Sequence, residues 1–232
     1  ADVLCFQEFF HSTDPTYYDN LNYVMKNLGY PYYFYSWGGD GDKQWVGQII
    51  LSRIPITTTG MIRYPPPGMP ESLIYADVVF RGDTIRFFTT HLQSMRLKKE
   101  DYERIESIKK PDDNVFINSR NIFSKWKRAA VYRSTQADIV KKVTSESPYP
   151  YILCGDFNDV PNSYTYYTIS DGLQDAFLKK GFGIGRTYAF LSPTLRIDYI
   201  LTTKNLFIQQ FNRLVKNYSD HYMLVADVKF VK

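Results

Sequence analysis

The sequence predicts an α+β fold in which β-sheets pack face to face and helices cover the outside. Short apolar runs bounded by Gly, Pro or polar residues recur along the 232 residues, and only two or three stretches have helical spacing. Sheets this numerous bury their apolar faces against one another. Aromatic residues make up 17% of the chain, which suits large side chains between packed layers.

The first part of the chain contains four strand-like runs and one run with helical spacing. In Ala1–Gln7 the apolar residues stand together instead of alternating, which predicts a buried strand that Glu8 ends. Apolar residues at helical spacing over Tyr17–Leu28, followed by Gly29, predict a helix. The other elements expected here are strands at Tyr32–Ser36, Val46–Leu51 and Ile56–Arg63, a turn at Trp37–Lys43 and a loop at Tyr64–Pro70.

Strands also dominate the rest of the chain. The runs Leu73–Phe80 and Thr84–His91 flank the turn residues Arg81–Asp83 and predict a hairpin. No repeat, low-complexity tract or linker interrupts the sequence, so we expect one domain over residues 1–232. The other elements expected are strands at Tyr151–Cys154, Arg196–Leu201, Leu206–Val215 and Met223–Phe230, and a short helix or turn at Ser163–Ser170.

The segment from Met95 to Arg133 is basic, with eleven Lys and Arg against six Asp and Glu. It predicts a helical arm, a break near residues 109–114 and a long helix over about Ser119–Val143. The charges form either a solvated helix surface or a rim that guides anions, and the net charge of +4 fits an anionic substrate without requiring nucleic acid. One face of the long helix is expected to carry Ile122, Trp126, Ala129, Ala130, Arg133 and Ala137.

Cysteine content and hydropathy restrict the class of protein. Cys5 and Cys154 are too few for a disulfide framework and lack metal-ligand spacing, so we expect two small buried apolar side chains. No apolar run approaches the ~18 residues of a membrane span, and no signal peptide is visible. The chain begins at Ala1 inside a strand-like run, so we expect a soluble domain of unknown compartment, with membrane association only through upstream residues.

Polar residues stand where the apolar runs stop, and strand ends are where loops carry functional groups. Glu8, Asp156 and Asp220 are hard oxygen donors that suit Mg²⁺ or Mn²⁺ rather than structural zinc. Histidines suit proton transfer or contacts to phosphoryl oxygens. The full set is Glu8, His91, Asp156, Asn158, Asp198, Asp220 and His221.

Each of these residues also has a purely structural interpretation. Asp156 and Asn158 could form only an Asx turn, and His91 could be a half-buried histidine that bonds a backbone carbonyl. A buried Asp198 requires a partner, for which Arg196 is a candidate. Their occurrence together favours a functional site.

Six motifs carry a resemblance to a known family. "LCFQE", "GQIILSR", "THLQS", "GDFN", "RIDYIL" and "SDHYML" follow one another in the order found in the endonuclease/exonuclease/phosphatase superfamily, which the whole chain resembles. The resemblance implies a four-layer αββα sandwich of two packed, mostly antiparallel sheets flanked by helices. It also implies a Mg²⁺- or Mn²⁺-dependent phosphoric ester hydrolase that uses in-line attack of water.

The resemblance assigns a role to each motif residue. It implies that Glu8 binds the metal ion and that Asp220 supports it. Asp156 would position and deprotonate the attacking water, and Asn158 would bond the nucleophile or a phosphoryl oxygen. Asp159, which follows directly, is expected only to shape the turn.

The two motif histidines are implied to act on the phosphoryl group from opposite sides. His221 would contact it while Asp198 orients the imidazole and favours its charged form. His91 would approach the phosphoryl oxygens from the other side.

The chain departs from the family pattern at its start. The family opens with an earlier strand that ends in Asn and completes the metal shell, and the residues given begin downstream of it, so we expect weak metal binding. "THLQS" resembles the phospholipid, sphingomyelin, inositol-phosphate and tyrosyl-DNA phosphodiesterases. We therefore expect a monomer acting on a lipid headgroup or small phosphate ester; a nuclease acting on DNA or RNA, and a non-catalytic binding module, are the alternatives.

Overall fold

The computed structural model describes residues 1–38, 43–65, 72–108, 115–190, 192 and 194–231. The turn expected at Trp37–Lys43 and the loop expected at Tyr64–Pro70 lie mostly outside these residues, and the break expected at 109–114 lies wholly outside them.

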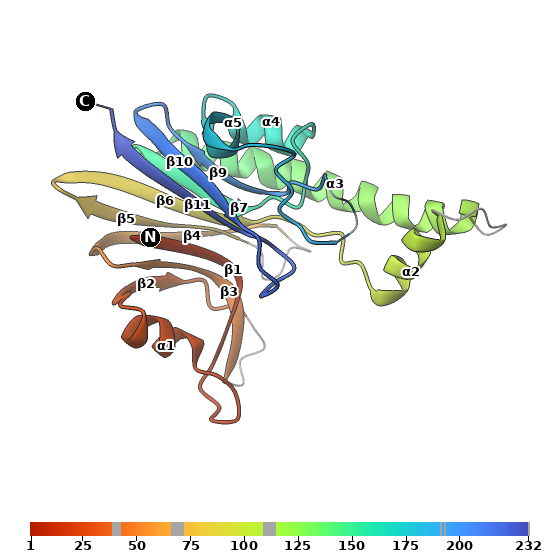
Figure 1. Cartoon of the computed structure of the whole chain (residues 1–232), viewed down its shortest axis with the longest axis horizontal. Helices are drawn as coiled ribbons and strands as arrows, with labels where there is room; N and C mark the ends of the chain where they lie inside the picture. The colour runs from red at the N-terminus through yellow and green to blue at the C-terminus, as the bar shows by residue number, and fades with distance from the viewer. Residues whose placement is uncertain (39–42, 66–71, 109–114, 191, 193, 232) are drawn as a thin grey trace.

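A six-stranded sheet forms the centre of the fold (Figure 1). All neighbouring strands are antiparallel except β6 and β7, which are parallel. The parallel pair places the carboxyl ends of β6 and β7 at the same edge. In order the strands are β4 (Ile56–Arg63), β5 (Ser72–Phe80), β6 (Asp83–His91), β7 (Tyr151–Asp156), β9 (Asp198–Thr202) and β8 (Gln174–Asp175).

Two smaller sheets pack against one face of this sheet. One has the order β1 (Val3–Ser12), β3 (Gln44–Ser52), β2 (Tyr32–Tyr35), and the other pairs β10 (Leu206–Leu214) with β11 (Met223–Phe230). Phe87 of β6 contributes to both of the apolar clusters that lie between the sheets. In the described residues this layer consists of two separate sheets.

Helices cover the outer faces and complete the predicted α+β sandwich. The helix α1 (Asn20–Asn27) packs on the three-stranded sheet through Leu21 and Val24. The other face of the six-stranded sheet is covered by α3 (Val115–Ser145) and α4 (Tyr164–Ser170). The remaining helices are α2 (Lys99–Ile108) and α5 (Ala176–Lys180). Within the described residues, none of the helices combines the length and the hydrophobicity of a membrane span.

The hairpin predicted after residue 72 is confirmed. Phe80 of β5 pairs with Asp83 of β6, so Arg81 and Gly82 form a two-residue turn. Both have positive φ, 53° and 92°, as a type I′ turn requires. Its twist matches that of the flanking strands.

The prediction that Glu8 ends the first strand is wrong. β1 continues to Ser12, and its pairing with β3 shifts register between Phe6 and Phe9. Glu8 lies in this irregularity with a φ of 51°. A bulge redirects a side chain without ending the strand, and the sequence gives no signal for it because Glu8 is not a glycine.

Other boundaries differ by a few residues. The helix expected from Tyr17 begins at Asn20, because the Asp19 side chain accepts a hydrogen bond from the Asn22 amide at 3.1 Å and caps it. At the C-terminus of this helix Gly29 has a φ of 73°, as a helix-ending glycine should. The strand predicted from Arg196 begins at Asp198.

The long helix α3 has two distinct parts. Its C-terminal part packs on the six-stranded sheet through Ala137 and Val140. Its N-terminal part projects beyond the sheet together with α2 (Figure 1). Of the residues expected on one face of this helix, Ala129 and Arg133 are buried, whereas the side chain of Trp126 is exposed.

Candidate active site

Three polar residues stand in a row across one edge of the six-stranded sheet. His91 at the end of β6 pairs with Asp156 at the end of β7, and Asp156 pairs with Asp198 at the start of β9. The close approach of β6 and β7 depends on Gly155, since a Cβ there would lie 2.3 Å from the Thr90 carbonyl oxygen. The register thus brings together residues that lie more than 100 positions apart in sequence.

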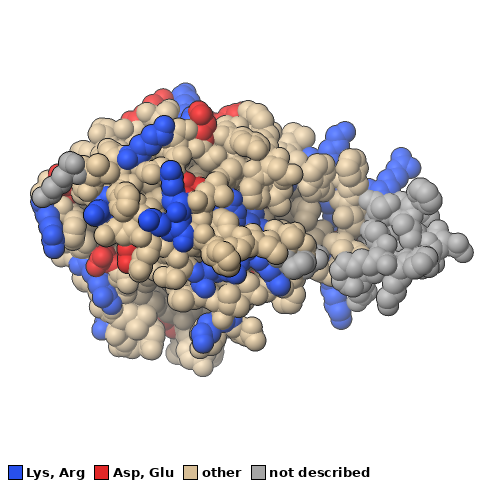
Figure 2. All heavy atoms as spheres, turned by 45° about the horizontal axis from the view of Figure 1, so that its top comes forward, with Lys and Arg blue, Asp and Glu red and all other residues tan. Residues whose placement is uncertain are grey.

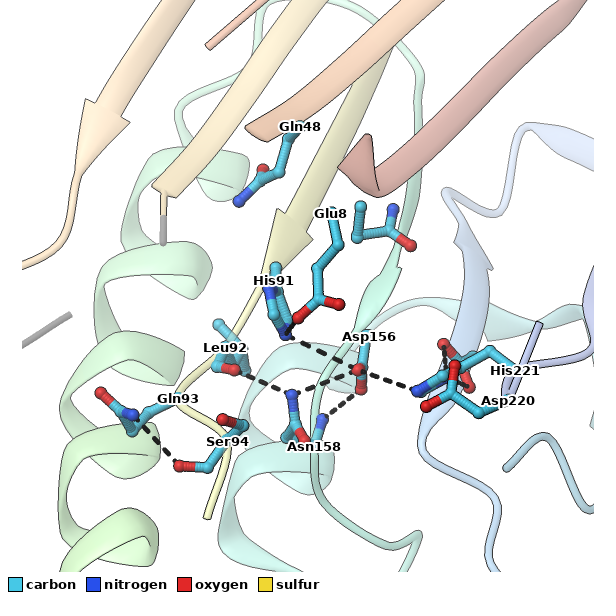
Figure 3. A network of polar contacts seen from close by, with 12 residues as sticks. Glu8, Gln48, His91, Leu92, Gln93, Ser94, Asp156, Asn158, Asp220 and His221 are labelled. Carbon is cyan, nitrogen blue, oxygen red and sulfur yellow. Dashed lines mark hydrogen bonds and ion pairs between the residues drawn. The ribbon is translucent and has the colours of Figure 1, made fainter. Parts of the chain in front are cut away.

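The turn after β7 fixes the Asp156 carboxylate. Oδ1 accepts a hydrogen bond from the Asn158 amide at 2.7 Å, and Oδ2 accepts one from Asn158 Nδ2 at 3.2 Å. Asn158 has a φ of 51°, and its Nδ2 also donates to the Leu92 carbonyl at 3.0 Å. The Asx turn considered from the sequence is therefore present, and it forms the floor of the polar cluster in Figure 3.

His221 joins this row from the loop before β11. Its Nδ1 lies 2.9 Å from Asp198 Oδ2, and its Nε2 lies 3.8 Å from Asp156 Oδ2. Burial opposes the charged imidazole, but the hydrogen bond and charge of Asp198 outweigh it and raise the pKa of His221 to about 9. Arg196 is not the partner of Asp198; it pairs instead with Asp175 at 2.6 Å.

His91 lies on the other side of Asp156. Its Nε2 is 3.7 Å from Asp156 Oδ2 and 3.9 Å from Glu8 Oε1. Burial, followed by the nearby His221, lowers the pKa of His91 to about 4. The two histidines therefore have opposite protonation states at neutral pH: His221 is charged and His91 is neutral.

Glu8 reaches the same cluster from the opposing sheet. Its side chain is 73% exposed and points from the bulge of β1 towards His91 and Asp156 (Figure 3). Asp220, next to His221, is exposed, and its Oδ1 accepts a hydrogen bond from Ser219 Oγ at 3.2 Å. Glu8 and Asp220 are thus exposed carboxylates at the border of the cluster.

The arrangement fits a divalent cation. Ligand atoms of Asp156, Asp198 and His221 all lie within 4.8 Å of one another and form a group that could hold a metal ion once the imidazole of His221 has lost its proton. Burial and the charge of Asp198 raise the pKa of Asp156, so a cation would relieve an unfavourable concentration of negative charge. Carboxylate oxygens are the ligands that Mg²⁺ and Mn²⁺ prefer.

Comparison with known proteins identifies the family. The model of the "Endonuclease/Exonuclease/phosphatase family" matches residues 1–221. The chain belongs to the endonuclease/exonuclease/phosphatase family. Its members are phosphoric ester hydrolases, and the chain is therefore an enzyme of this class. Among curated proteins the search finds no significant match.

Solved structures of the endonuclease/exonuclease/phosphatase family share the fold. A humanized TDP2 from D. rerio is 18% identical with a TM-score of 0.67, over 98% of this chain and 85% of that chain. The human Nocturnin catalytic domain with bound sulfate is 19% identical with a TM-score of 0.66, over 99% of this chain and 81% of that chain. A family protein from Beutenbergia cavernae is 18% identical with a TM-score of 0.68; this chain is covered to 99% but spans only 62% of that one.

The family motifs do not include Thr187, which ties the His221 loop to β9. Its buried hydroxyl accepts hydrogen bonds from the amides of Ile197 and Asp198 at 2.9 and 3.1 Å. Its carbonyl accepts one from the Tyr222 amide at 2.8 Å. Thr187 therefore fixes the distance between Asp198 and His221. A threonine between loop residues gives no sequence signal for this role.

Aromatic side chains border the His221 side of the site. The Tyr188 ring lies 4.9 Å from the imidazole of His221, and its hydroxyl is 3.0 Å from that of Tyr102 on α2. Phe190, which is exposed, packs edge-on against Tyr188. Tyrosines are so numerous in this sequence that their position alone could not single these out.

A buried ion pair supports the loops from the helix side. Arg133 of α3 donates from Nε to Asp159 Oδ2 at 3.0 Å and from Nη1 to the Gln93 carbonyl at 3.0 Å. Thr165 also donates to Asp159 at 2.8 Å. These bonds hold the loops after β6 and β7 together, which agrees with the expectation that Asp159 shapes the turn.

Proposed function

We propose that this chain hydrolyses a phosphate ester, as a phosphodiesterase or phosphatase, with Mg²⁺ or Mn²⁺ and water as the nucleophile. The observation that supports this most directly is the convergence of Glu8, His91, Asp156 and His221 on one cluster. Two oppositely charged environments meet there: an acidic side suited to a cation and a cationic imidazole suited to a phosphoryl oxygen. The lipid-headgroup or small-molecule substrate remains part of the proposal.

Asp156 is the proposed base. Its carboxylate lies between the two imidazoles, and the two hydrogen bonds from Asn158 hold it in one orientation. Both Nδ2 hydrogens of Asn158 have acceptors within the protein. We therefore infer that Asn158 orients Asp156, in place of the direct contact with the nucleophile or phosphoryl oxygen that the resemblance implies.

The two histidines would act differently on the phosphoryl group. His221, charged and held by Asp198, would donate from Nε2 to a phosphoryl oxygen and stabilise its developing charge. His91, which is neutral at the same pH, would donate a hydrogen bond to a phosphoryl oxygen from the other side. Because its ring carries no charge, it would not compete with the metal ion for the carboxylate ligands.

The proposed metal ligands are Glu8 and Asp220, with the Asp156 carboxylate lying between them in Figure 3. A bound divalent cation would offset the charge of the phosphate and stabilise the leaving oxygen. The protein itself supplies carboxylate oxygen ligands for this cation from two sheets and one loop.

A substrate panel with matched variants tests the proposal. The wild type is assayed on p-nitrophenyl phosphate, bis(p-nitrophenyl) phosphate and a single-stranded oligonucleotide, with Mg²⁺, Mn²⁺ or chelator. Asp156→Asn should lower kcat by at least about 10²–10³. Asp227→Asn, at an exposed carboxylate bonded to Gln210 on β10, should leave it unchanged.

Four results bear on the assignment. Turnover that survives chelation, or an Asp156→Asn variant with full activity, would remove the basis of the proposal. Glu8→Gln should weaken Mg²⁺ binding in a metal titration, and unchanged affinity would show that Glu8 is not a ligand. Preference for the oligonucleotide, with a steep loss of affinity as salt rises, would favour the nuclease alternative.

A further inference from the structure

The part of the structure that projects beyond the sheets has no role in the site just described. We call it the α2–α3 arm: the helix α2 with residues 115–131 of α3 (Figure 1). Only α2 packs against this part of α3 in the described structure, whereas the later turns of α3 are buried on the sheet. The described side chains on the outer side of α3, such as Phe123 and Val131, are exposed to solvent.

A stripe of large apolar and cationic side chains runs along this outer side. Arg120, Phe123, Lys127 and Val131 are spaced by three or four residues and so lie on one face of α3. Phe123 is 60% exposed, Val131 58% and Trp126, at the border of the stripe, 47%. The rings of Phe123 and Trp126 stack with their centroids 5.6 Å apart.

The charge of this part of α3 is entirely positive. From Val115 to Ala137 the sequence has five Lys and Arg and no Asp or Glu. Lys125 and Arg133 are paired, with Asp101 and Asp159 respectively. The other three, Arg120, Lys127 and Arg128, are exposed and form no ion pair within the described part of the chain. In Figure 2, Lys and Arg side chains stand on the described part of the projecting end.

The arm is attached directly to the rim of the candidate site. The Tyr102 hydroxyl of α2 is 3.0 Å from that of Tyr188, whose ring lies against His221. Only seven residues separate His91 from the start of α2. A surface that holds the arm would therefore lie next to the opening of the site.

We propose that the exposed α3 face of the α2–α3 arm, rather than α2 with its four Asp and Glu against two Lys and Arg, docks on an anionic phospholipid bilayer. Phe and Trp side chains insert at the boundary between headgroups and acyl chains, and flanking Lys and Arg bind anionic headgroups. The exposed Lys and Arg side chains thus favour a surface of negative charge, and the exposed apolar side chains favour a surface with an apolar interior. This surface lies within the residues given, whereas the sequence had suggested membrane association only through upstream residues.

Nucleic acid is the competing polyanion, and the geometry favours the bilayer. Proteins that bind single strands stack bases on aromatic faces inside a groove. Here the two rings stack on each other, and Val131 offers no face for stacking. The stripe lies on a projecting helix that can lie flat on a surface. If the proposed activity is also correct, this docking would present phosphate esters of the lipid surface to the site.

Vesicle co-sedimentation tests the docking without any assay of turnover. Wild-type protein should bind vesicles of phosphatidylcholine with phosphatidylglycerol and should bind pure phosphatidylcholine much more weakly. Lys127→Gln with Arg128→Gln should reduce binding to the anionic vesicles by roughly twentyfold, about fivefold per charge. Phe123→Ser with Trp126→Ser should reduce it by about tenfold or more.

Phe182→Ser supplies the matched control, because Phe182 is 97% exposed but lies outside the arm, in the segment after α5. It should bind like the wild type. If this control loses as much vesicle binding as the Phe123/Trp126 variant, the binding is not specific to the arm. If the wild type does not bind anionic vesicles, the proposal is overturned. Fluorescence anisotropy with a single-stranded oligonucleotide completes the test: binding there without vesicle binding would identify nucleic acid as the partner.

Different experimental results would contradict the proposed docking and the proposed function. The arm variants should hydrolyse soluble bis(p-nitrophenyl) phosphate at the wild-type rate, since none of the substituted side chains lies in the site. A protein that binds vesicles but hydrolyses nothing would retain the docking and lose the proposed function. Circular dichroism should show unchanged melting for all arm variants, because the residues are exposed.

Discussion

At the scale of single residues, Thr187 is the position where a small change should have the largest effect on the site. Thr187→Val keeps the shape but removes the hydroxyl, which leaves the amides of Ile197 and Asp198 without their acceptor. Each buried unpaired amide costs about 1–3 kcal/mol. We expect the free energy of unfolding and kcat to fall while KM changes little.

Thr187→Ser is the rescue control, because the hydroxyl is kept. It should restore kcat to near the wild-type value, as measured by steady-state kinetics and denaturant unfolding. If the serine and valine variants lose kcat equally, the hydrogen bonds of Thr187 do not position the Asp198–His221 pair.

The charge of His221 is the second residue-scale prediction. Asp198→Asn removes the nearest negative charge, so the pKa of His221 should fall from about 9. The sign follows because a neutral amide no longer favours the imidazolium while burial still disfavours it. NMR titration of the imidazole in the presence of chelator measures this directly. An unchanged pKa would show that Asp198 does not stabilise the charged ring.

At the scale of secondary-structure elements, α3 is fastened to the site loops by one buried side chain. Arg133→Met breaks the ion pair with Asp159 and leaves a buried carboxylate uncompensated, which costs about 3–5 kcal/mol. Lys141→Met is the matched control on the same helix, because its pair with Asp171 is largely exposed and should contribute little to stability. Urea unfolding compares the two, and equal losses would contradict the special role of Arg133.

At the scale of the whole molecule, the six-stranded sheet connects all the layers. Phe87 and Phe88 are neighbours on β6 that point into clusters on opposite faces of the sheet. Because β6 contributes side chains to the clusters on both faces, loss of packing on one face would also disrupt the packing on the other. We therefore propose that residues 1–232 unfold as one domain. Differential scanning calorimetry should give a single transition with equal calorimetric and van't Hoff enthalpies. Two resolved transitions would show independent units.

The cysteines provide a reporter of this transition. Cys5 and Cys154, both free and half-buried, come from facing sheets, and the hydrogen bond between them, with burial, raises the pKa of the Cys5 thiol. The Cys5 thiol should react slowly with an alkylating reagent in the native protein, because the thiolate is the reactive form. Reaction should accelerate at the same denaturant concentration at which the fold is lost. Fast labelling of the native protein would show that the sheets separate locally.

The sequence by itself determined most of the elements and the motif residues of this protein. Alternation and run length are local properties, so the β5–β6 hairpin and the strands β4 and β11 could be predicted almost residue by residue. The motif residues could be predicted as a set because polar residues that interrupt apolar runs are visible in the sequence alone.

Only the tertiary structure decided how those residues meet. Asp198 pairs with His221 and not with its neighbour Arg196, and Glu8 points into the site from a bulge inside β1 rather than from its end. Thr187 gained its role from bonds to residues ten or more positions away. Such contacts depend on strand register and on the packing of two sheets, and neither leaves a periodic pattern in the chain, which is why local reasoning could not supply them.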